Sequence, residues 1–392
     1  MKEKTIFGAE IFCEKHTNQY KALNIALLIN QASIVFDREN ILYCLLKKGM
    51  KIKKVFFPQH GFFQDKQDNM IESEDFEKDG IKFISLYGKK FAPSENDLED
   101  IDLIIYDIQD VGARIYTFVS TLFLLLKALN NKETKLIILD RPNPLGRKME
   151  GNIVEKGFSS FVGIYPIPML YGLTPAELAL YFIKKEKLSI DFTPIKIKNW
   201  DGSFFELTGR KWYPTSPNMP FYTTSYIYPG TVLLEGTNVS EGRGTTRPFE
   251  IIGAPFINSE EIANELNRLK LRGVNFIPYA FTPTFNKWSG ELCGGVFIVV
   301  SAFEKSFPYK TGILILKIIK RLYPDKFKWK SPPYEYEREK LPIDIITGSD
   351  KVRKFVENDN INSIDFFMSK NFEEEIKTIR LYQPKRKLLF NY

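Results

Sequence analysis

Apolar residues in the first half of the chain gather in short runs, and segments with helical periodicity separate these runs. The runs that predict strands cover residues 24–30, 54–58, 81–87, 101–108 and 135–139. One helix is predicted from Asp37, its N-terminal cap, through Leu46, and a second over residues 113–129. Continuous apolar strands separated by helices are typical of a parallel sheet that is covered on both faces.

The second half has a less regular pattern. Thr174, Pro175 and Glu177 form a capping signature that predicts a helix over residues 174–187. The other predicted elements are strands at 191–200 and 295–300 and helices at 259–269, 311–322 and within 366–382. Because 392 residues are too many for one ordinary core, we expect two domains, residues 1–195 and 196–392.

Residues 228–255, in the second predicted domain, combine glycines and hydroxyl groups with charged side chains. Their sequence is YPGTVLLEGTNVSEGRGTTRPFEIIGAP. Gly236, Gly242 and Gly244 permit backbone angles that other residues avoid, and successive amides in such turns can bind an anion. A structural loop with surface ion pairs is the alternative, but ordered irregular loops of this length are usually functional.

Polar side chains lie at the expected carboxyl ends of the parallel strands. They are Asn30, Gln59, His60, Asp107, Gln109, Asp110, Asp140 and Arg141. Open parallel sheets bind ligands outside these ends, so the pattern predicts contacts with a sugar, and capping of turns or helices is the alternative. The first strand lacks the glycine pattern of a dinucleotide-binding turn, and no phosphate-binding loop motif occurs. Neither a nicotinamide nor a flavin cofactor is therefore expected.

Composition narrows the expected partners. The net charge of +7 is spread along the chain, which argues against nucleic acid and suits the steering of an anionic substrate. Two histidines and three cysteines without metal-ligand spacing argue against a metal site and indicate buried or incidental thiols. The N-terminus has no signal-peptide core, and the apolar stretch 118–129 is too short to span a bilayer. We therefore expect a cytoplasmic protein without a membrane partner, and a secreted protein whose signal peptide has been removed is the alternative.

A series of motifs resembles a known family in composition and in order. The motifs are PQHG at 58–61, SLYG at 85–88, YDIQDVGARIYT at 106–117, LDRPNPLGR at 139–147, EG at 150–151, FVGIYPIP at 161–168, SPNMP at 216–220, the segment 228–256 and FTPTF at 281–285. Over nearly its whole length the chain is similar to the exo-acting β-N-acetylmuramidases, a glycoside hydrolase family formerly described only as a bacterial domain of unknown function. The unbroken match over 228–256 makes the resemblance specific.

The resemblance implies a Rossmann-like α/β domain followed by a smaller α/β (α+β) domain, with the active site in the cleft between them. It implies removal of terminal N-acetylmuramic acid from the non-reducing end of peptidoglycan fragments, without a cofactor. The partner is then a small carbohydrate that contains muramic acid. Its lactyl carboxylate would suit Arg141, Arg243 or Arg247.

Position 59 departs from the family pattern, which has Pro-Glu-His-Gly where this chain has Gln59. The family's glutamate is a proposed catalytic acid or base, and an amide cannot exchange a proton usefully near neutral pH. Glycoside hydrolysis commonly needs two carboxyl groups. Either another carboxylate replaces it, or the acetamido group of the substrate assists, or the chain binds cell-wall sugars without cleaving them. Because Asn30-Gln31-Ala32 also replaces the family's Thr-Asn-Pro, altered specificity or hydrolysis of another carbohydrate is a further alternative.

These motifs supply the candidate site residues. The candidates for catalysis are Gln59, His60, Glu72, Glu150 and Glu241, with Glu74 and Asp107 as further carboxylates that could replace the missing glutamate. The candidates for substrate binding are Asn30, Asp107, Gln109, Asp110, Arg114, Asp140, Arg141, Asn218, Glu235, Asn238, Arg243 and Arg247.

Overall fold

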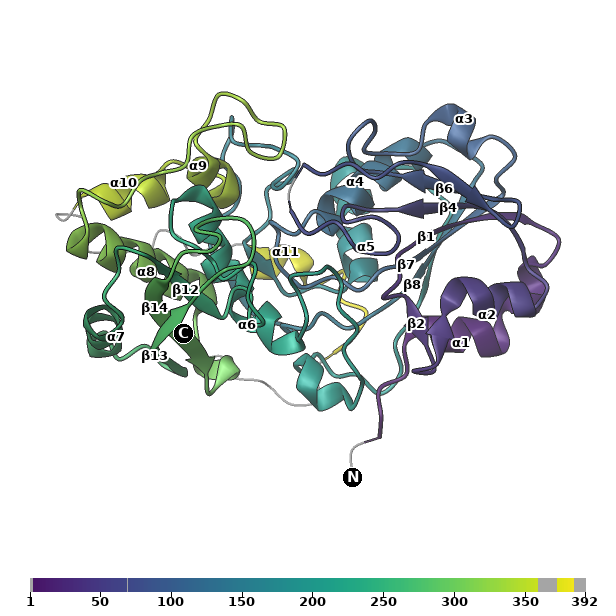
Figure 1. Ribbon diagram of the computed structural model, residues 1–392. Helices are drawn as coiled ribbons and strands as arrows, with labels where there is room; N and C mark the ends of the chain where they lie inside the picture. Colours follow the sequence, from purple (N-terminus) through teal and green to yellow (C-terminus); the bar gives the residue numbers. More distant parts are fainter. Residues whose placement is uncertain (1–2, 69, 359–371, 384–392) are drawn as a thin grey trace.

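The structure is a computed structural model that describes residues 3–68, 70–358 and 372–383. Two lobes lie side by side, with the N-terminal half of the chain on the right of Figure 1 and most of the C-terminal half on the left. The first lobe is built on a seven-stranded sheet in the order β11-β8-β7-β1-β4-β6-β5, which is parallel except for β5. The predicted α/β class is confirmed.

The elements of the first lobe follow the predicted pattern closely. The strands of the large sheet are β1 Asn24–Ile29, β4 Lys51–Phe57, β5 Phe76–Lys78, β6 Ile81–Ser85, β7 Leu103–Asp107, β8 Lys135–Leu139 and β11 Phe192–Ile195. Two short strand pairs accompany it, β2 Ile34–Val35 with β3 Glu39–Asn40, and β9 Met149–Glu150 with β10 Leu170–Tyr171. The helices are α1 Gly8–Lys15, α2 Ile41–Lys47, α3 Glu95–Leu98, α4 Phe118–Leu129 and α5 Pro175–Glu186, with 3-10 turns η1 Thr17–Tyr20 and η2 Phe205–Thr208.

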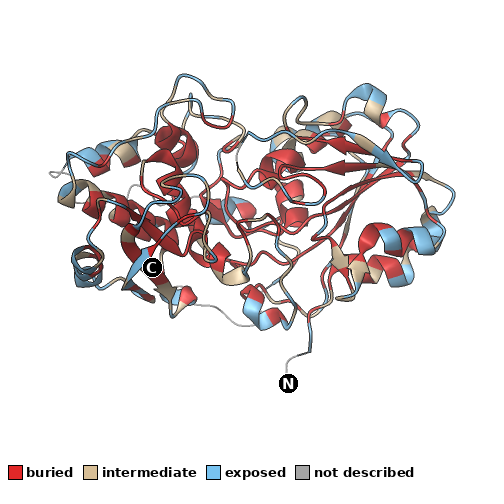
Figure 2. Ribbon diagram, viewed as in Figure 1, coloured by how far each residue is buried: buried red, intermediate tan, exposed pale blue. Residues whose placement is uncertain are grey.

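Alternate residues of the central strand β1 face opposite helix layers. Ile25, Leu27 and Ile29 pack in one apolar cluster with α1 and α2, whereas Ala26 and Leu28 belong to the cluster that contains α4 and α5. In Figure 2 the sheet and the inner sides of these helices are buried. Both faces of the sheet are therefore covered, which explains why its strands are continuous apolar runs in the sequence.

Local hydrogen bonds decide where the helices of this lobe begin. The prediction of Asp37 as the cap of α2 is wrong, because this residue has a left-handed backbone with a φ of 54°. The cap is Asn40, whose side chain accepts a hydrogen bond from the backbone N–H of Leu42. The capping box of Thr174 and Glu177 at the start of α5 is confirmed.

The second lobe combines a small antiparallel sheet with helices. Its strands are β12 Ile251–Ala254, β13 Val274–Phe281 and β14 Cys293–Val300, in the order β12-β14-β13. Its helices are α6 Tyr222–Thr231, α7 Ser259–Arg268, α8 Pro308–Leu322, α9 Pro342–Thr347 and α10 Lys351–Glu357, with η3 Val232–Gly236 and η4 Phe303–Lys305. A last helix, α11 Phe372–Ile376, lies within the predicted segment 366–382, of which residues 366–371 fall outside the described residues.

Helices α6 and α8 approach each other closely at two glycines. A Cβ on Gly230 would lie 2.0 Å from the carbonyl oxygen of Pro308, and a Cβ on Gly312 would lie 2.1 Å from the carbonyl oxygen of Gly230. Any larger residue at either position would push the helices apart. This contact fixes α6 and, directly after it, η3, which carries Glu235.

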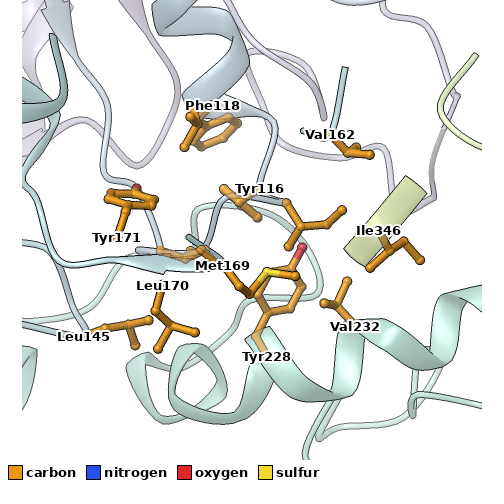
Figure 3. Packing of buried hydrophobic residues seen from close by; sticks show 14 of the residues in the cluster. Tyr116, Phe118, Leu145, Val162, Met169, Leu170, Tyr171, Tyr228, Val232 and Ile346 are labelled. Atoms are coloured by element: carbon orange, nitrogen blue, oxygen red, sulfur yellow. The ribbon is translucent and has the colours of Figure 1, made fainter. Parts of the chain in front are cut away.

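One apolar cluster continues from the α4 and α5 side of the sheet into the second lobe. Figure 3 shows Tyr116 and Met169 of the first lobe packed with Tyr228, Val232 and Ile346 of the second. The rings of Tyr116 and Tyr228 meet edge to face with centroids 5.9 Å apart. The two lobes therefore share a core, and the domain boundary after residue 195 stays a prediction.

Three sequence-based expectations concern membrane segments, metal sites and thiols. In the part of the chain that the structure describes, every helix is too short or too polar to cross a bilayer. Among the same residues, no group of three or more His, Cys, Asp or Glu side chains is arranged to hold a metal ion. Cys13, Cys44 and Cys293 are buried free thiols.

Protein side chains fill the position where a parallel sheet commonly binds its ligand. Strand order reverses between β1 and β7, and ligands usually bind beyond the carboxyl ends of the strands there. At this place Arg141 Nε and Nη2 lie 2.5 and 2.8 Å from the two carboxylate oxygens of Asp107. Nη2 also donates to the carbonyl oxygen of Ile34 in β2. The ion pair is buried and joins the end of β7 to Arg141 directly after β8, and Arg141 in turn bonds the β2–β3 hairpin.

We expect Asp107→Asn to lower the free energy of unfolding by roughly 3–5 kcal/mol, because it leaves the buried charge of Arg141 without its partner. Urea denaturation measures this loss. As a control, Lys127→Ala removes the exposed ion pair with Glu186 and should lower the free energy of unfolding by at most about 1 kcal/mol. Equal losses in the two variants would contradict a structural role for the buried pair.

Candidate active site

A pocket that opens to solvent is lined by residues from both lobes. The lining residues are Gln59, His60, Ile115, Tyr116, Thr117, Val162, Ser216, Asn218, Met219, Tyr228, Glu235, Arg243, Phe249, Tyr334 and Glu335. They come from the end of β4, the segment before α4, the SPNMP motif, the predicted segment 228–255 and a turn near residue 335. The pocket therefore joins most of the motifs that predicted a site.

The segment before α4 reaches the pocket because it is not helical. The prediction that residues 113–117 belong to the helix is wrong, since Ala113 pairs with Leu170 in an isolated β-bridge and α4 begins at Phe118. After this bridge the chain runs through turns that bring Ile115, Tyr116 and Thr117 to the pocket wall.

The side-chain amide of Gln59 is held at both ends. The hydroxyl of Thr117 donates to Oε1 at 2.6 Å, and Nε2 donates to Oε1 of Glu335 at 3.2 Å. Gln59 follows β4 directly, whereas Glu335 belongs to the second lobe. This hydrogen bond therefore crosses between the lobes inside the pocket.

The carboxyl group of Glu335 is buried, and each of its oxygens accepts a hydrogen bond. Besides the amide of Gln59, the phenol of Tyr87 donates to Oε2 at 2.7 Å. Burial raises the pKa of Glu335 to about 7, although these two hydrogen bonds act to lower it, and nearby Glu235 raises it further. Near neutral pH this group is therefore present in both protonation states.

The second carboxylate in the pocket is held in an ion pair. Arg243 Nη2 lies 2.6 Å from Glu235 Oε1, and the phenol of Tyr334 donates to Oε2 at 2.7 Å. Behind it, Glu241 lies 3.2 Å from Arg243 Nε and 2.7 Å from Lys287 Nζ. The alternating charges compensate one another, so the guanidinium favours the ionised form of Glu235.

His60 has a neutral imidazole ring, and its backbone φ is positive, at 73°. Its Nδ1 lies 2.7 Å from the carbonyl oxygen of Lys66, which can only accept, so Nδ1 carries the hydrogen and Nε2 is left as an acceptor. Burial lowers the pKa of His60 to about 4. The carbonyl oxygen of the next residue, Gln67, accepts 2.8 Å hydrogen bonds from both Asn218 and Arg243.

The pocket brings together two carboxyl groups with opposite tendencies. Glu335 is buried without a cation and tends to hold its proton, whereas Glu235 is paired with Arg243. Such a pair can deliver a proton to one atom of a ligand while a negative charge stabilises another.

The structure brings five of the sequence-predicted site residues together in the pocket. They are Gln59, His60, Asn218, Glu235 and Arg243. Glu241 touches Arg243 from behind and does not line the pocket.

The other polar strand ends do not line the pocket, because they satisfy backbone and side-chain groups within the first lobe. Asn30 accepts a hydrogen bond from the backbone N–H of Ala32, and Gln109 donates to the carbonyl oxygens of Asp110 and Pro142. Asp110 accepts from the backbone N–H of Gly112 and from Tyr171. Asp140 accepts from Thr174, from the backbone N–H of Ala176 and from Tyr382, and Asp107 pairs with Arg141. Arg114 donates to the carbonyl oxygens of Asn152, Ile167, Ile346 and Thr347. These side chains hold the scaffold around the pocket.

Four further candidates also lie away from the pocket lining. Glu72 packs against Gly88, where an added Cβ would lie 2.5 Å from its Cγ. Asn238 bonds backbone groups of residues 326 and 328, and Arg247 is 43% exposed beside Glu250. The carboxylate of Glu150 accepts a 2.7 Å hydrogen bond from the backbone N–H of Lys310. Glu74, the remaining alternative carboxylate, is exposed.

Sequence reasoning did not select Thr117, Tyr334 and Glu335 of the pocket lining, nor Tyr87, which donates to Glu335. Tyr87 and Thr117 lie within the motifs SLYG and YDIQDVGARIYT but were not singled out there. The available signal was the order Pro-Pro-Tyr-Glu-Tyr at 332–336, in which a carboxylate stands between two aromatic residues after two prolines.

We expect the stability of Glu150→Gln relative to wild type to rise with pH. Burial raises the pKa of Glu150 from 4.5 to about 7, so its stabilising contribution is fully present below pH 4.5 and is lost as pH rises through about 7. The variant lacks this loss and should gain up to about 3 kcal/mol relative to wild type across that window. Urea denaturation of both proteins at the two ends of the window measures the gain, and parallel pH profiles would contradict it.

Comparison with known proteins agrees with the motifs. The family model described as exo-beta-N-acetylmuramidase NamZ, N-terminal, matches residues 25–223, and the C-terminal model of the same family matches residues 226–382. The peptidoglycan beta-N-acetylmuramidase NamZ of Bacillus subtilis (strain 168) is 37% identical over 386 residues, which are 97% of this chain and 91% of the relative.

Two crystal structures of DUF1343 family proteins from Bacteroides fragilis NCTC 9343 share the fold. Each is 29% identical to this chain, and each match covers 97% of this chain and 99% of the other, with TM-scores of 0.86 and 0.72. The family models together span both lobes and all the residues that line the pocket. The chain therefore belongs to the exo-beta-N-acetylmuramidase NamZ family.

Proposed function

We propose that the protein is a glycoside hydrolase that releases terminal N-acetylmuramic acid from the non-reducing end of peptidoglycan fragments. Membership of the NamZ family and the named activity of the Bacillus subtilis relative support this proposal. The observation that carries it is the presence of Glu235 and Glu335 in one pocket, because most glycosidases act through two carboxyl groups that flank the scissile bond.

The pocket suits one end of a carbohydrate chain. It is lined by polar groups from both lobes, among them Gln59, Glu235 and Glu335, which can bind the hydroxyl groups of a sugar. Ile115, Val162 and Met219 line it and also belong to the central apolar core, so the pocket stops at these side chains. A pocket that is closed on one side favours a terminal sugar over an internal one.

Binding without cleavage is the second candidate function, and Gln59 is the observation that favours it. In that case the protein would retain the sugar pocket of its family and lack the chemistry. The two functions differ in a simple experiment, because a binding protein would show heat of binding with a muramyl sugar in calorimetry and no release of product.

The biological setting follows from the proposed reaction and stays a prediction. A protein that removes single muramic acid units from fragments would serve the recycling of cell-wall sugars, and the low number of cysteines, all free, suits the reducing cytoplasm. Fractionation of cells that express the tagged full-length gene product tests the location.

We expect wild-type protein to hydrolyse a chromogenic β-N-acetylmuramide and to leave the matching β-N-acetylglucosaminide largely intact. Glu235→Gln should lower kcat/KM for the muramide at least about 100-fold, because it removes the ionised carboxylate from the pocket. Glu339→Gln, an exposed control of the same chemistry, should retain full activity. Absence of turnover by correctly folded wild type would rule out the hydrolase, and binding in calorimetry would then establish the second candidate.

A further inference from the structure

The turn that carries Glu335 has a backbone that is unfavourable for its residues. Tyr334 and Glu337 exchange two backbone hydrogen bonds of 2.9 Å, which closes a two-residue hairpin turn. The two central residues, Glu335 and Tyr336, have φ values of 45° and 68°. Turns of this kind favour Asn and Gly at both positions, because a Cβ is crowded in the left-handed region.

This backbone strain coincides with side chains that are directed into the pocket. Tyr334 donates to Glu235, while the adjacent Glu335 accepts from Gln59 and Tyr87. Strained backbone persists where the surrounding structure over-determines it, and it clusters at active sites. The same unfavourable backbone occurs at His60 and Phe249, two other residues of the pocket wall.

The other candidates for a proton donor, His60 and Glu241, have surroundings that differ from those of Glu335. The Nδ1–H of His60 is used by the carbonyl oxygen of Lys66, and the ring has no second proton to give. Glu241 forms ion pairs with Arg243 and Lys287 and does not line the pocket. Glu335 is the remaining acidic group in the pocket wall whose surroundings, with burial as the main cause, favour the protonated form.

We propose that Glu335 is the catalytic acid of this protein and that Gln59 is the residue that positions it. The proposal rests on the function proposed above and assigns the chemistry that the family's glutamate at position 59 would otherwise supply. The amide of Gln59, fixed by Thr117, donates to one oxygen of Glu335 and leaves the proton of the carboxyl group free to turn toward a bound glycoside.

The proposed hydrolysis needs Glu335, Glu235 and one water molecule, and its bonds and protons balance as follows. Glu335 gives its proton to the glycosidic oxygen, the bond from that oxygen to the anomeric carbon breaks, and its electron pair leaves with the departing sugar alcohol. A water oxygen bonds to the anomeric carbon, and the proton that this water loses passes to Glu235, the second carboxylate. Exchange with solvent then restores the proton of Glu335 and removes that of Glu235.

If Glu335 protonates the leaving group, its removal should slow hydrolysis most for substrates whose leaving group needs a proton. For a methyl β-N-acetylmuramide, whose alkoxide leaves poorly, Glu335→Gln should lower kcat at least about 100-fold with little change in KM. For a dinitrophenyl β-N-acetylmuramide, whose phenolate leaves without a proton, the same variant should lose less than about tenfold. Glu339→Gln, from the same segment but exposed, should behave as wild type with both substrates. Circular dichroism and thermal unfolding check that both variants are folded.

A second variant tests the role of position 59. Gln59→Glu places a carboxyl group against Glu335, and like charges at such a distance raise the pKa of the pair. The alkaline limb of the pH profile of kcat should therefore move up by about one pH unit or more while the methyl glycoside is still hydrolysed. In Glu335→Gln the alkaline limb should disappear.

The outcomes separate this assignment from the proposed function. A folded wild type that hydrolyses neither muramide would overturn both. A wild type that is active, together with Glu335→Gln that keeps its kcat for the methyl glycoside, would overturn the assignment alone. It would also be overturned if the double variant Gln59→Glu, Glu335→Gln were as active as Gln59→Glu, because the acid would then be the carboxyl group at position 59.

Discussion

The hydrogen bond from Gln59 to Glu335 is the contact on which the site depends, because it joins the end of a strand in the first lobe to a turn in the second. Around it, Tyr87 and Thr117 fix the other ends of the two side chains. The shared apolar core joins the two lobes, and the close crossing of α6 and α8 fixes η3 within the second lobe. The pocket is thus a product of the interface and belongs to neither lobe alone.

The two carboxyl groups of the pocket are chemically the same, but their surroundings favour different protonation states. Glu235 lies beside Arg243, which favours its negative charge. Glu335 is buried against neutral donors, so desolvation opposes ionisation and the hydrogen bonds only partly offset this effect. Assignment of an acid and a stabilising base follows from this difference in surroundings, which no inspection of residue types could reveal.

The sequence was sufficient for most of the fold because apolar periodicity reports burial directly. The covered sheet, the capping box of α5 and the amphipathic α8 are all local patterns. The helix start predicted at Asp37 was wrong because the local hydrogen bond from Leu42 N–H to Asn40 sets the start of α2. The helical prediction for residues 113–117 was wrong because the bridge from Ala113 to the distant Leu170 decides the backbone path there.

The site was predictable only in part, and the polar strand ends show why. Asp107, Asp140 and Arg141 were predicted to meet the ligand, but the scaffold uses their charges to satisfy buried groups of its own. The segment 228–255 did supply Glu235 and Arg243 to the pocket, as its combination of glycines and charged side chains predicted. Glu335 lies in an irregular segment whose left-handed backbone has no signature in residue type, so periodicity and motif spacing passed over it.

Direct titration of Glu335 tests the central claim most closely. The difference between infrared spectra of wild type and Glu335→Gln, recorded over a pH series, isolates the carbonyl band of this one carboxylic acid. If Glu335 is the catalytic acid, the protonated band should persist to near-neutral pH and disappear with a midpoint of about 7. A midpoint near 4.5, the ordinary value for a glutamic acid, would show that Glu335 is already ionised where the enzyme would need its proton, and would contradict the account.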